Sequence, residues 1–134
     1  MSKINLKPTK CNLCGGEVIF ISNAAVYHGK QFGSGYCYLC QQCGAYVGTH
    51  IDKPDVALGI LANDRMRSMK INCHALFDRH WQYKPTKRER KSARGHMYKE
   101  FAKRMGMTQE ECHFGYFDLP TLYRAYDLLR KWRD

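Results

Sequence analysis

Short apolar runs separated by glycines and polar residues fill the first half of the chain. The runs at residues 17–21, 36–39 and 45–49 are rich in branched and aromatic side chains. Such side chains favour β-strands because they pack well on a pleated, half-buried surface. Residues 27–35 carry three glycines, which indicate a mobile loop or a hairpin tip between the first two runs. The pattern therefore predicts short antiparallel strands in this half of the chain.

Beyond residue 63, apolar side chains recur with the three- and four-residue spacing of an amphipathic helix. Asn63 or Asp64 can cap a first helix, which we expect to run to about Trp81. The apolar positions of this helix are Met66, Met69, Cys73, Leu76, Phe77 and Trp81. An apolar segment at residues 56–61 precedes the helix and could dock the first half of the chain onto the second half.

Capping residues predict where the next helices begin and end. Thr86 and Glu89 have the form of a capping box, so a helix should begin there and end at Gly106. Its predicted buried positions are Ala93, Met97, Phe101 and Met105. Residues 108–111 repeat the capping-box form and should open a short turn of helix, and a last helix should begin near Asp118. The last helix is expected to pack through Leu122, Tyr126, Leu129 and Trp132.

Four cysteines form two short hooks, one before the first apolar run and one after the second. Cys11 and Cys14 make the first hook, Cys40 and Cys43 make the second, and a glycine follows each hook. Two thiolates three residues apart can bind one side of a metal ion, and the glycine lets the backbone turn tightly. Two such hooks complete a tetrahedral set of sulfurs, which is typical of a closed structural zinc site. We therefore predict one structural Zn²⁺ bound by these four cysteines.

Other interpretations of the cysteines are weaker. A redox pair needs a βαβ pattern that the chain lacks, and a disulfide framework suits a secreted chain better. Cys37 could pair with Cys40 instead of Cys43, but only the segment from Cys40 to Cys43 ends in the Cys-Gly of the first hook. A second zinc site is conceivable, although adjacent Cys-His pairs lack the usual hook spacing. Its ligands would be Cys73, His74, Cys112 and His113.

These patterns predict an α+β fold with two regions. Residues 1–54 would form a four-cysteine zinc ribbon with short antiparallel strands, and residues 55–134 a basic region of three to four helices. We expect the two regions to pack together as one compact unit. Zinc binding should supply folding free energy that so few strands cannot provide.

Composition places the chain among folded, non-membrane proteins. Of its 134 residues, 44% are hydrophobic and 13% are aromatic. No apolar run approaches the roughly 20 residues that span a bilayer, and the first residues lack the apolar core of a signal peptide. We therefore expect a reducing cytoplasmic location, where metal binding and free thiols account for seven cysteines. We expect neither a membrane partner nor a small-molecule substrate.

Charge points to a polyanionic partner. The formal net charge is +10, and residues 65–104 alone carry thirteen basic and three acidic residues. A field of this size attracts nucleic acid first and acidic protein surfaces second. A basic face that only aids solubility is the simpler alternative.

The best candidates for contacts with nucleic acid are the basic residues of the helix that begins at Thr86 and of the approach to it. They are Lys84, Lys87, Arg88, Arg90, Lys91, Arg94, Lys99, Lys103 and Arg104. Such residues position a protein on phosphates without specifying bases. Aromatic residues of the ribbon could stack on bases, although strand packing explains them more simply. These aromatic residues are Tyr27, Phe32, Tyr36, Tyr38 and Tyr46.

The order and spacing of several motifs resemble a family of uncharacterised zinc-finger-containing proteins of bacteria and their phages. The matching stretches are the first hook, residues 38–50, residues 58–63, residues 74–78 with Trp81, and residues 112–118. The resemblance implies the same four cysteine ligands and a shared signature of unknown role, formed by His74, Asp78, Trp81, His113 and Asp118. It implies a bacterial or phage-infected host cell as the location. It implies no established activity.

Three functions remain open. The first is a non-enzymatic, zinc-stabilised protein, of phage or mobile-element type, that binds DNA or RNA through its basic helical face. The second, favoured by the phage-like resemblance, is an anti-CRISPR-like inhibitor or adaptor that binds a host or defence nucleoprotein complex. The third is a metal-dependent nuclease that uses His74, Asp78 or His113. No His-Glu-x-x-His motif, paired acidic motif or nucleotide-binding glycine loop supports an enzyme.

Overall fold

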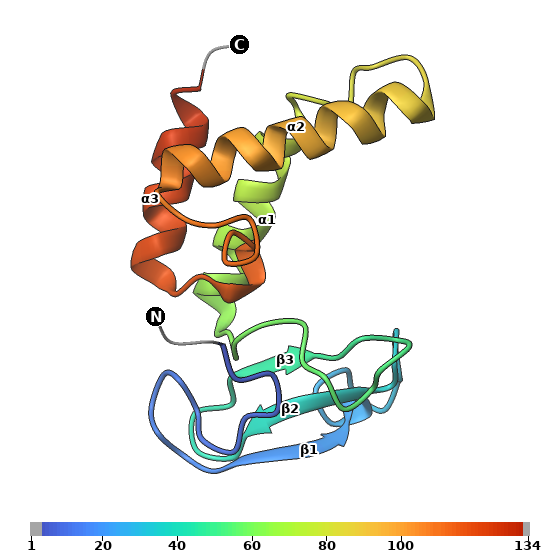
Figure 1. Cartoon of the computed structure of the whole chain (residues 1–134). Helices are drawn as coiled ribbons and strands as arrows, with labels where there is room; N and C mark the ends of the chain where they lie inside the picture. The colour runs from blue at the N-terminus through green and yellow to red at the C-terminus, as the bar shows by residue number, and fades with distance from the viewer. Residues whose placement is uncertain (1–3, 133–134) are drawn as a thin grey trace. The chain divides into compact units, whose positions relative to one another are not determined.

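The chain folds into a three-stranded antiparallel sheet followed by three α-helices, as a computed structural model that describes residues 4–132 shows (Figure 1). The chain divides after Arg65 into two compact units, which we call the ribbon unit and the helical unit. Within the described residues, the strands all belong to the first unit. This architecture confirms the predicted α+β class.

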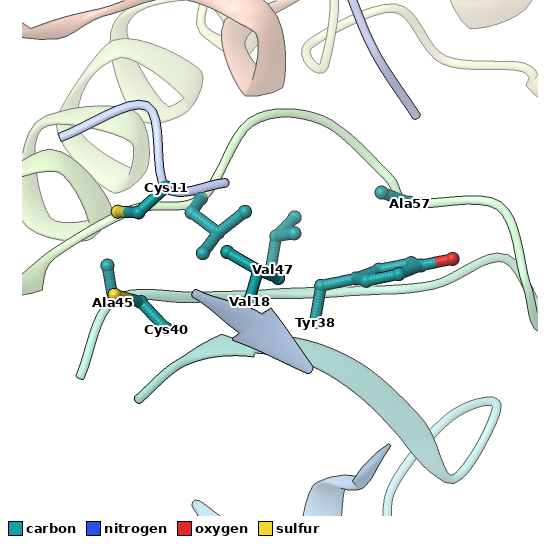
Figure 2. Packing of buried hydrophobic residues seen from close by; sticks show 8 residues of the cluster. Cys11, Val18, Tyr38, Cys40, Ala45, Val47 and Ala57 are labelled. Carbon is teal, nitrogen blue, oxygen red and sulfur yellow. The ribbon is translucent and has the colours of Figure 1, made fainter. Parts of the chain in front are cut away.

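The sheet of the ribbon unit follows the predicted strands. β1 (Val18–Ser22), β2 (Tyr36–Cys40) and β3 (Tyr46–Gly48) lie in the order β1-β2-β3. Val18 lies opposite Cys40, and Tyr38 lies opposite Val47, so these four side chains share one face of the sheet. Figure 2 shows the core that they form with other buried residues of the unit. The full cluster is Cys11, Val18, Tyr38, Cys40, Ala45, Val47, Ala57 and Leu61.

The apolar segment at residues 56–61 belongs to this core. Ala57 forms a β-bridge with Thr49, and Ala62 forms one with Tyr46 at the edge of the sheet. Ala57 and Leu61 are fully buried. We predicted that the helical region begins at residue 55 and includes this segment. In the structure the first compact unit extends to Arg65, so the segment belongs to the ribbon unit.

A buried asparagine organises the loop between β1 and β2. Asn23 opens the 3-10 helix η1 (Asn23–Ala25) and is 5% exposed. Its Nδ2 donates to the Phe32 carbonyl oxygen at 2.7 Å, and its Oδ1 accepts from the Phe32 amide at 3.2 Å. The ring of Tyr27 contacts the rings of Phe32 and Tyr46. The aromatic residues of this loop therefore pack on one another and on the sheet.

The helices begin and end close to their predicted limits. α1 spans Asp64–Asp78, α2 spans Lys87–Met105 and α3 spans Leu119–Arg130, with the 3-10 helix η2 at Phe114–Tyr116. The Thr86 hydroxyl accepts from the Glu89 amide at 3.1 Å, and Gly106 ends α2 with a φ of 73°. The helix expected at residues 108–111 is a hydrogen-bonded turn instead. α1 also ends before Trp81, because residues 79–83 form turns.

Aromatic rings fill the core of the helical unit. The rings of Phe77, Phe101 and Phe114 contact one another, with centroids 5.4 to 5.8 Å apart. Leu122 and Leu129 of α3 are fully buried. The predicted apolar positions Leu76, Trp81, Ala93 and Tyr126 are half-buried. Phe114 is buried in this core but was not among the apolar positions predicted for the helices. This second core contains no cysteine of the two hooks.

Candidate metal centre and basic surface

The two cysteine hooks adopt the same backbone turn. The Gly15 amide donates to the Cys11 carbonyl oxygen at 2.9 Å, and the Gly44 amide donates to that of Cys40 at 3.1 Å. Gly15 and Gly44 have φ values of 77° and 81°, a conformation that side chains other than glycine rarely adopt. The glycine after each hook thus has the role that the sequence pattern predicted.

The turns bring the four predicted ligands together. The sulfur atoms of Cys11, Cys14, Cys40 and Cys43 all lie within 4.8 Å of one another. The sulfurs of Cys11 and Cys43 are 3.7 Å apart, and those of Cys14 and Cys40 are 3.5 Å apart. Tetrahedral zinc with Zn–S bonds of about 2.3 Å requires sulfurs about 3.8 Å apart. The cluster therefore fits a single metal ion and is consistent with one structural Zn²⁺.

Backbone amides around the cluster favour thiolates. The amides of Cys43 and Gln42 donate to the Cys40 sulfur at 3.4 Å and lower the pKa of this thiol to about 6. The Gly16 amide lowers the pKa of Cys14, but the neighbouring Cys40 and burial raise it to about 12. Four thiolates this close repel one another unless a cation lies between them. Zn²⁺ would supply that charge and cross-link the two hooks.

Gly16 lets the two hooks approach each other. A Cβ atom on this residue would lie 2.7 Å from Gln42 Cβ and 3.1 Å from Cys40 Sγ. Both distances are shorter than ordinary van der Waals contacts, and neither neighbour can rotate away without moving the second hook. The hook pattern explains Gly15 and Gly44, but the requirement at Gly16 depends on a contact between segments that are far apart in sequence.

We expect Gly16→Ala to lower the free energy of unfolding by about 1–3 kcal/mol, as overpacking does, and to weaken zinc binding. Gly95→Ala is the matched control, because Gly95 lies inside α2 and a Cβ atom added there would have no neighbouring atom within 4 Å. That control should stabilise the protein by about 0.5–1 kcal/mol. Urea unfolding and competition with a chelator measure both effects. Unchanged zinc affinity and stability in Gly16→Ala would contradict this role.

Asn12 connects the first hook to the apolar segment. Its Nδ2 donates to the Leu61 carbonyl oxygen at 3.0 Å, and its Oδ1 accepts from the Leu61 amide at 2.9 Å. The side chain thus pairs with both the N–H and the C=O of Leu61, as a residue of a neighbouring antiparallel strand would. This role of Asn12 was not predicted, because its position inside the hook is the one feature of the sequence that distinguishes it from other asparagines.

The other cysteines lie outside the metal cluster. Cys37 is buried in β2, and burial raises the pKa of its thiol. Cys73 and Cys112 are buried in the helical unit, where burial raises the pKa of each thiol to about 11. Within residues 4–132, the four hook cysteines are the one group of three or more His, Cys, Asp or Glu residues close enough to hold a metal.

The signature residues of the helical unit make structural contacts. Trp81 Nε1 donates to Asp78 Oδ1 at 3.0 Å, and the Asp118 carboxylate caps α3 by accepting from the Thr121 amide at 3.0 Å. The ring of His74 lies 4.6 Å from that of Phe114, and the ring of His113 lies 4.9 Å from that of Tyr116, measured between centroids. These contacts hold the ends of α1 and α3 and the turn between α2 and α3.

The predicted basic residues divide into two sets. Some have partners: Arg90 donates to the Lys84 carbonyl oxygen at 2.9 Å, Arg94 lies over the rings of Trp81 and Tyr98, and Arg104 lies 3.7 Å from the centroid of the Trp132 ring. Lys84 is half-buried, and its ammonium lies over the Tyr83 ring, 5.0 Å from the centroid. The remaining five are exposed and form no ion pair with any described residue. These free cations are Lys87, Arg88, Lys91, Lys99 and Lys103.

Comparison with known proteins identifies the family. A family model described as a zinc-finger-containing domain matches residues 7–132. No curated protein and no solved structure matches the chain. Among residues 4–132, no helix combines the length and apolar character needed to cross a membrane. Because the model covers both the sulfur cluster and the helical unit, the chain belongs to the zinc-finger-containing domain family.

Proposed function

We propose that this protein binds nucleic acid through the helical unit while zinc stabilises the ribbon unit. The observation that carries the proposal is the first half of α2. Between residues 87 and 96 no side chain is buried, and this stretch holds five basic residues and one acidic residue. Figure 1 shows this end of α2 extending past the other helices of its unit. Within the helical unit, this charged helix end is therefore accessible to a phosphate backbone.

Charge along this end of α2 is not neutralised within the unit. The one acidic residue, Glu89, accepts a hydrogen bond from the Thr86 hydroxyl at 2.9 Å. Lys87, Arg88 and Lys91 have no ion-pair partner among the described residues. Exposed cations without ion-pair partners attract polyanions, and their binding to phosphates releases the counterions condensed on the nucleic acid.

The closed sulfur cluster supports a scaffold role for the metal. Four thiolates leave no open coordination position for a substrate or a water molecule. The zinc site is therefore not expected to bind a substrate. We propose a non-enzymatic function whose basic residues contact phosphates more than base edges.

Binding to labelled single-stranded DNA, duplex DNA and RNA at increasing salt tests the proposal. With about six to ten phosphate contacts, affinity should fall by roughly 10³–10⁵-fold between about 50 and 200 mM salt. Absence of salt-dependent binding to all three would overturn the proposal. A different outcome is that the protein fails to bind free nucleic acid but retains an acidic protein, or a nucleoprotein complex, from a lysate even after nuclease treatment. That result would support the inhibitor or adaptor hypothesis.

A further inference from the structure

A groove of about 780 Å³ lies along one face of α2 in the helical unit. Its volume falls within the range of about 300–1,000 Å³ that is usual for ligand sites. Four of the lining positions are aromatic or imidazole rings, and charged groups lie between them. The residues that matter for the argument are Tyr83, Glu89, His96, Glu100, Arg104 and Trp132.

Flat surfaces line the groove. Tyr83 is 64% exposed, and His96 is exposed on α2. The Arg104 guanidinium is stacked on the Trp132 ring at 3.7 Å, so one face of the guanidinium is covered by that ring. Unpaired bases stack on aromatic rings and on guanidinium planes. These side chains thus offer stacking partners of the kind that single-stranded nucleic acid uses.

Helix geometry separates the charges of the groove from those of its edge. Glu89, His96 and Glu100 recur at intervals of seven and four residues, so they share the face that lines the groove. Arg88, Lys99 and Lys103 lie on the neighbouring row of the helix, which passes through Ser92 at the edge of the groove. The groove itself holds two carboxylates, Glu89 and Glu100, and two cations, Lys84 and Arg104, and Arg104 pairs with Glu100 at 3.4 Å. The charged residues of the row at its edge are all cations and attract phosphates.

We propose that this groove binds the unpaired bases of a single-stranded nucleic acid, whose backbone follows Arg88, Lys99 and Lys103. One base stacks on Tyr83 and another on the Arg104 guanidinium. Glu89 already accepts from Thr86 and Glu100 from Arg104, each through one carboxylate oxygen, and the second oxygen of each can accept a hydrogen bond from an exocyclic amino group. This inference rests on the proposed function and specifies its ligand as single-stranded.

Fluorescence anisotropy with three ligands of about 15 nucleotides tests the inference: an oligodeoxynucleotide, an abasic strand of the same length and a duplex. Because each stacked base contributes substantially to affinity, the base-containing strand should bind at least about tenfold more tightly than the abasic strand. Tyr83→Ala should reduce that preference about tenfold without weakening binding to the abasic strand, and Tyr83→Phe should retain it. Tyr123→Ala is the matched control, since Tyr123 is 43% exposed but does not line the groove.

The outcomes separate the inference from the proposed function. Equal affinity for the base-containing and abasic strands, or a preference for the duplex, overturns the inference while salt-dependent binding still supports a nucleic-acid-binding protein. No binding to any of the three ligands or to an RNA strand of the same length overturns both. An equal effect of Tyr83→Ala and Tyr123→Ala would also exclude this groove as the base site.

Discussion

Removal of zinc is expected to unfold the ribbon unit and leave the helical unit folded. The ribbon core consists of eight buried residues, and two of them, Cys11 and Cys40, are predicted zinc ligands. Structural zinc contributes about 10–16 kcal/mol of apparent binding free energy in small zinc domains. Three strands of five, five and three residues cannot compensate for such a loss.

The helical unit should withstand the same treatment because it has its own core. Phe77, Phe101, Leu122 and Leu129 are each at most 1% exposed, and no zinc ligand lies among the buried residues of the unit. Both tryptophans, Trp81 and Trp132, also belong to this unit, so their fluorescence reports on it alone.

A chelator titration of the full chain measures the two responses separately. Hydrogen exchange should show loss of amide protection in β1 to β3, while the far-ultraviolet helical signal and tryptophan emission change little. Cys40→Ser should reproduce the loss of zinc and of ribbon protection. Cys37→Ala is the matched control, because Cys37 is buried in the same strand outside the sulfur cluster and should still bind one zinc per chain. Retained ribbon protection after chelation, or loss of both units together, would contradict this prediction.

Local rules were sufficient to predict the hooks and the helix caps. The ligand spacing at Cys11–Cys14 and Cys40–Cys43 depends on three consecutive peptide links, and the capping box at Thr86 depends on one turn. Both are properties of a short segment, so tertiary contacts do not change them. The left-handed Gly106 that ends α2 was predictable for the same reason.

Features that depend on distant segments were not predictable. The apolar run at residues 56–61 has no helical or strand period, and only the bridge of Ala57 to Thr49 and that of the adjoining Ala62 to Tyr46 place it on the sheet. The contact that requires Gly16 is with Gln42 in the other hook. Similarly, the turns after Asp78 end α1 early, where Trp81 donates its hydrogen bond back to Asp78.

The contacts of the basic residues were likewise not predictable from the sequence. Charge density over residues 65–104 follows from composition, but the partner of each cation does not. Arg90 and Arg94 sit at the centre of the predicted basic side, yet one donates to a backbone carbonyl and the other lies over two rings. Reversing their charges would disturb the packing of α2 along with any binding, so they are poor probes of function.

Reversing the free cations should instead remove binding and leave the fold intact. Lys87, Arg88 and Lys91 are exposed, form no ion pair with any described residue and lie in the first turns of α2. Glutamate is a good helix former and is favourable near a helix N-terminus, so the triple change to glutamate should not lower stability. At about 1 kcal/mol for each lost phosphate contact, affinity for nucleic acid should fall on the order of a hundredfold. The slope of the logarithm of affinity against the logarithm of salt concentration should also decrease, by the amount expected for the loss of about three phosphate contacts.

A triple reversal in the ribbon unit provides the matched control. Lys10, Lys30 and Lys53 are exposed and form no ion pair among residues 4–132, so changing them to glutamate lowers the net charge by the same amount. If α2 contains the binding surface, affinity should fall much less in this control than in the α2 variant. Equal losses would show that nucleic acid responds to the overall charge of +10 and not to a surface on α2. Thermal unfolding of both variants separates loss of binding from loss of structure, because a binding defect at α2 should occur without a change in Tm.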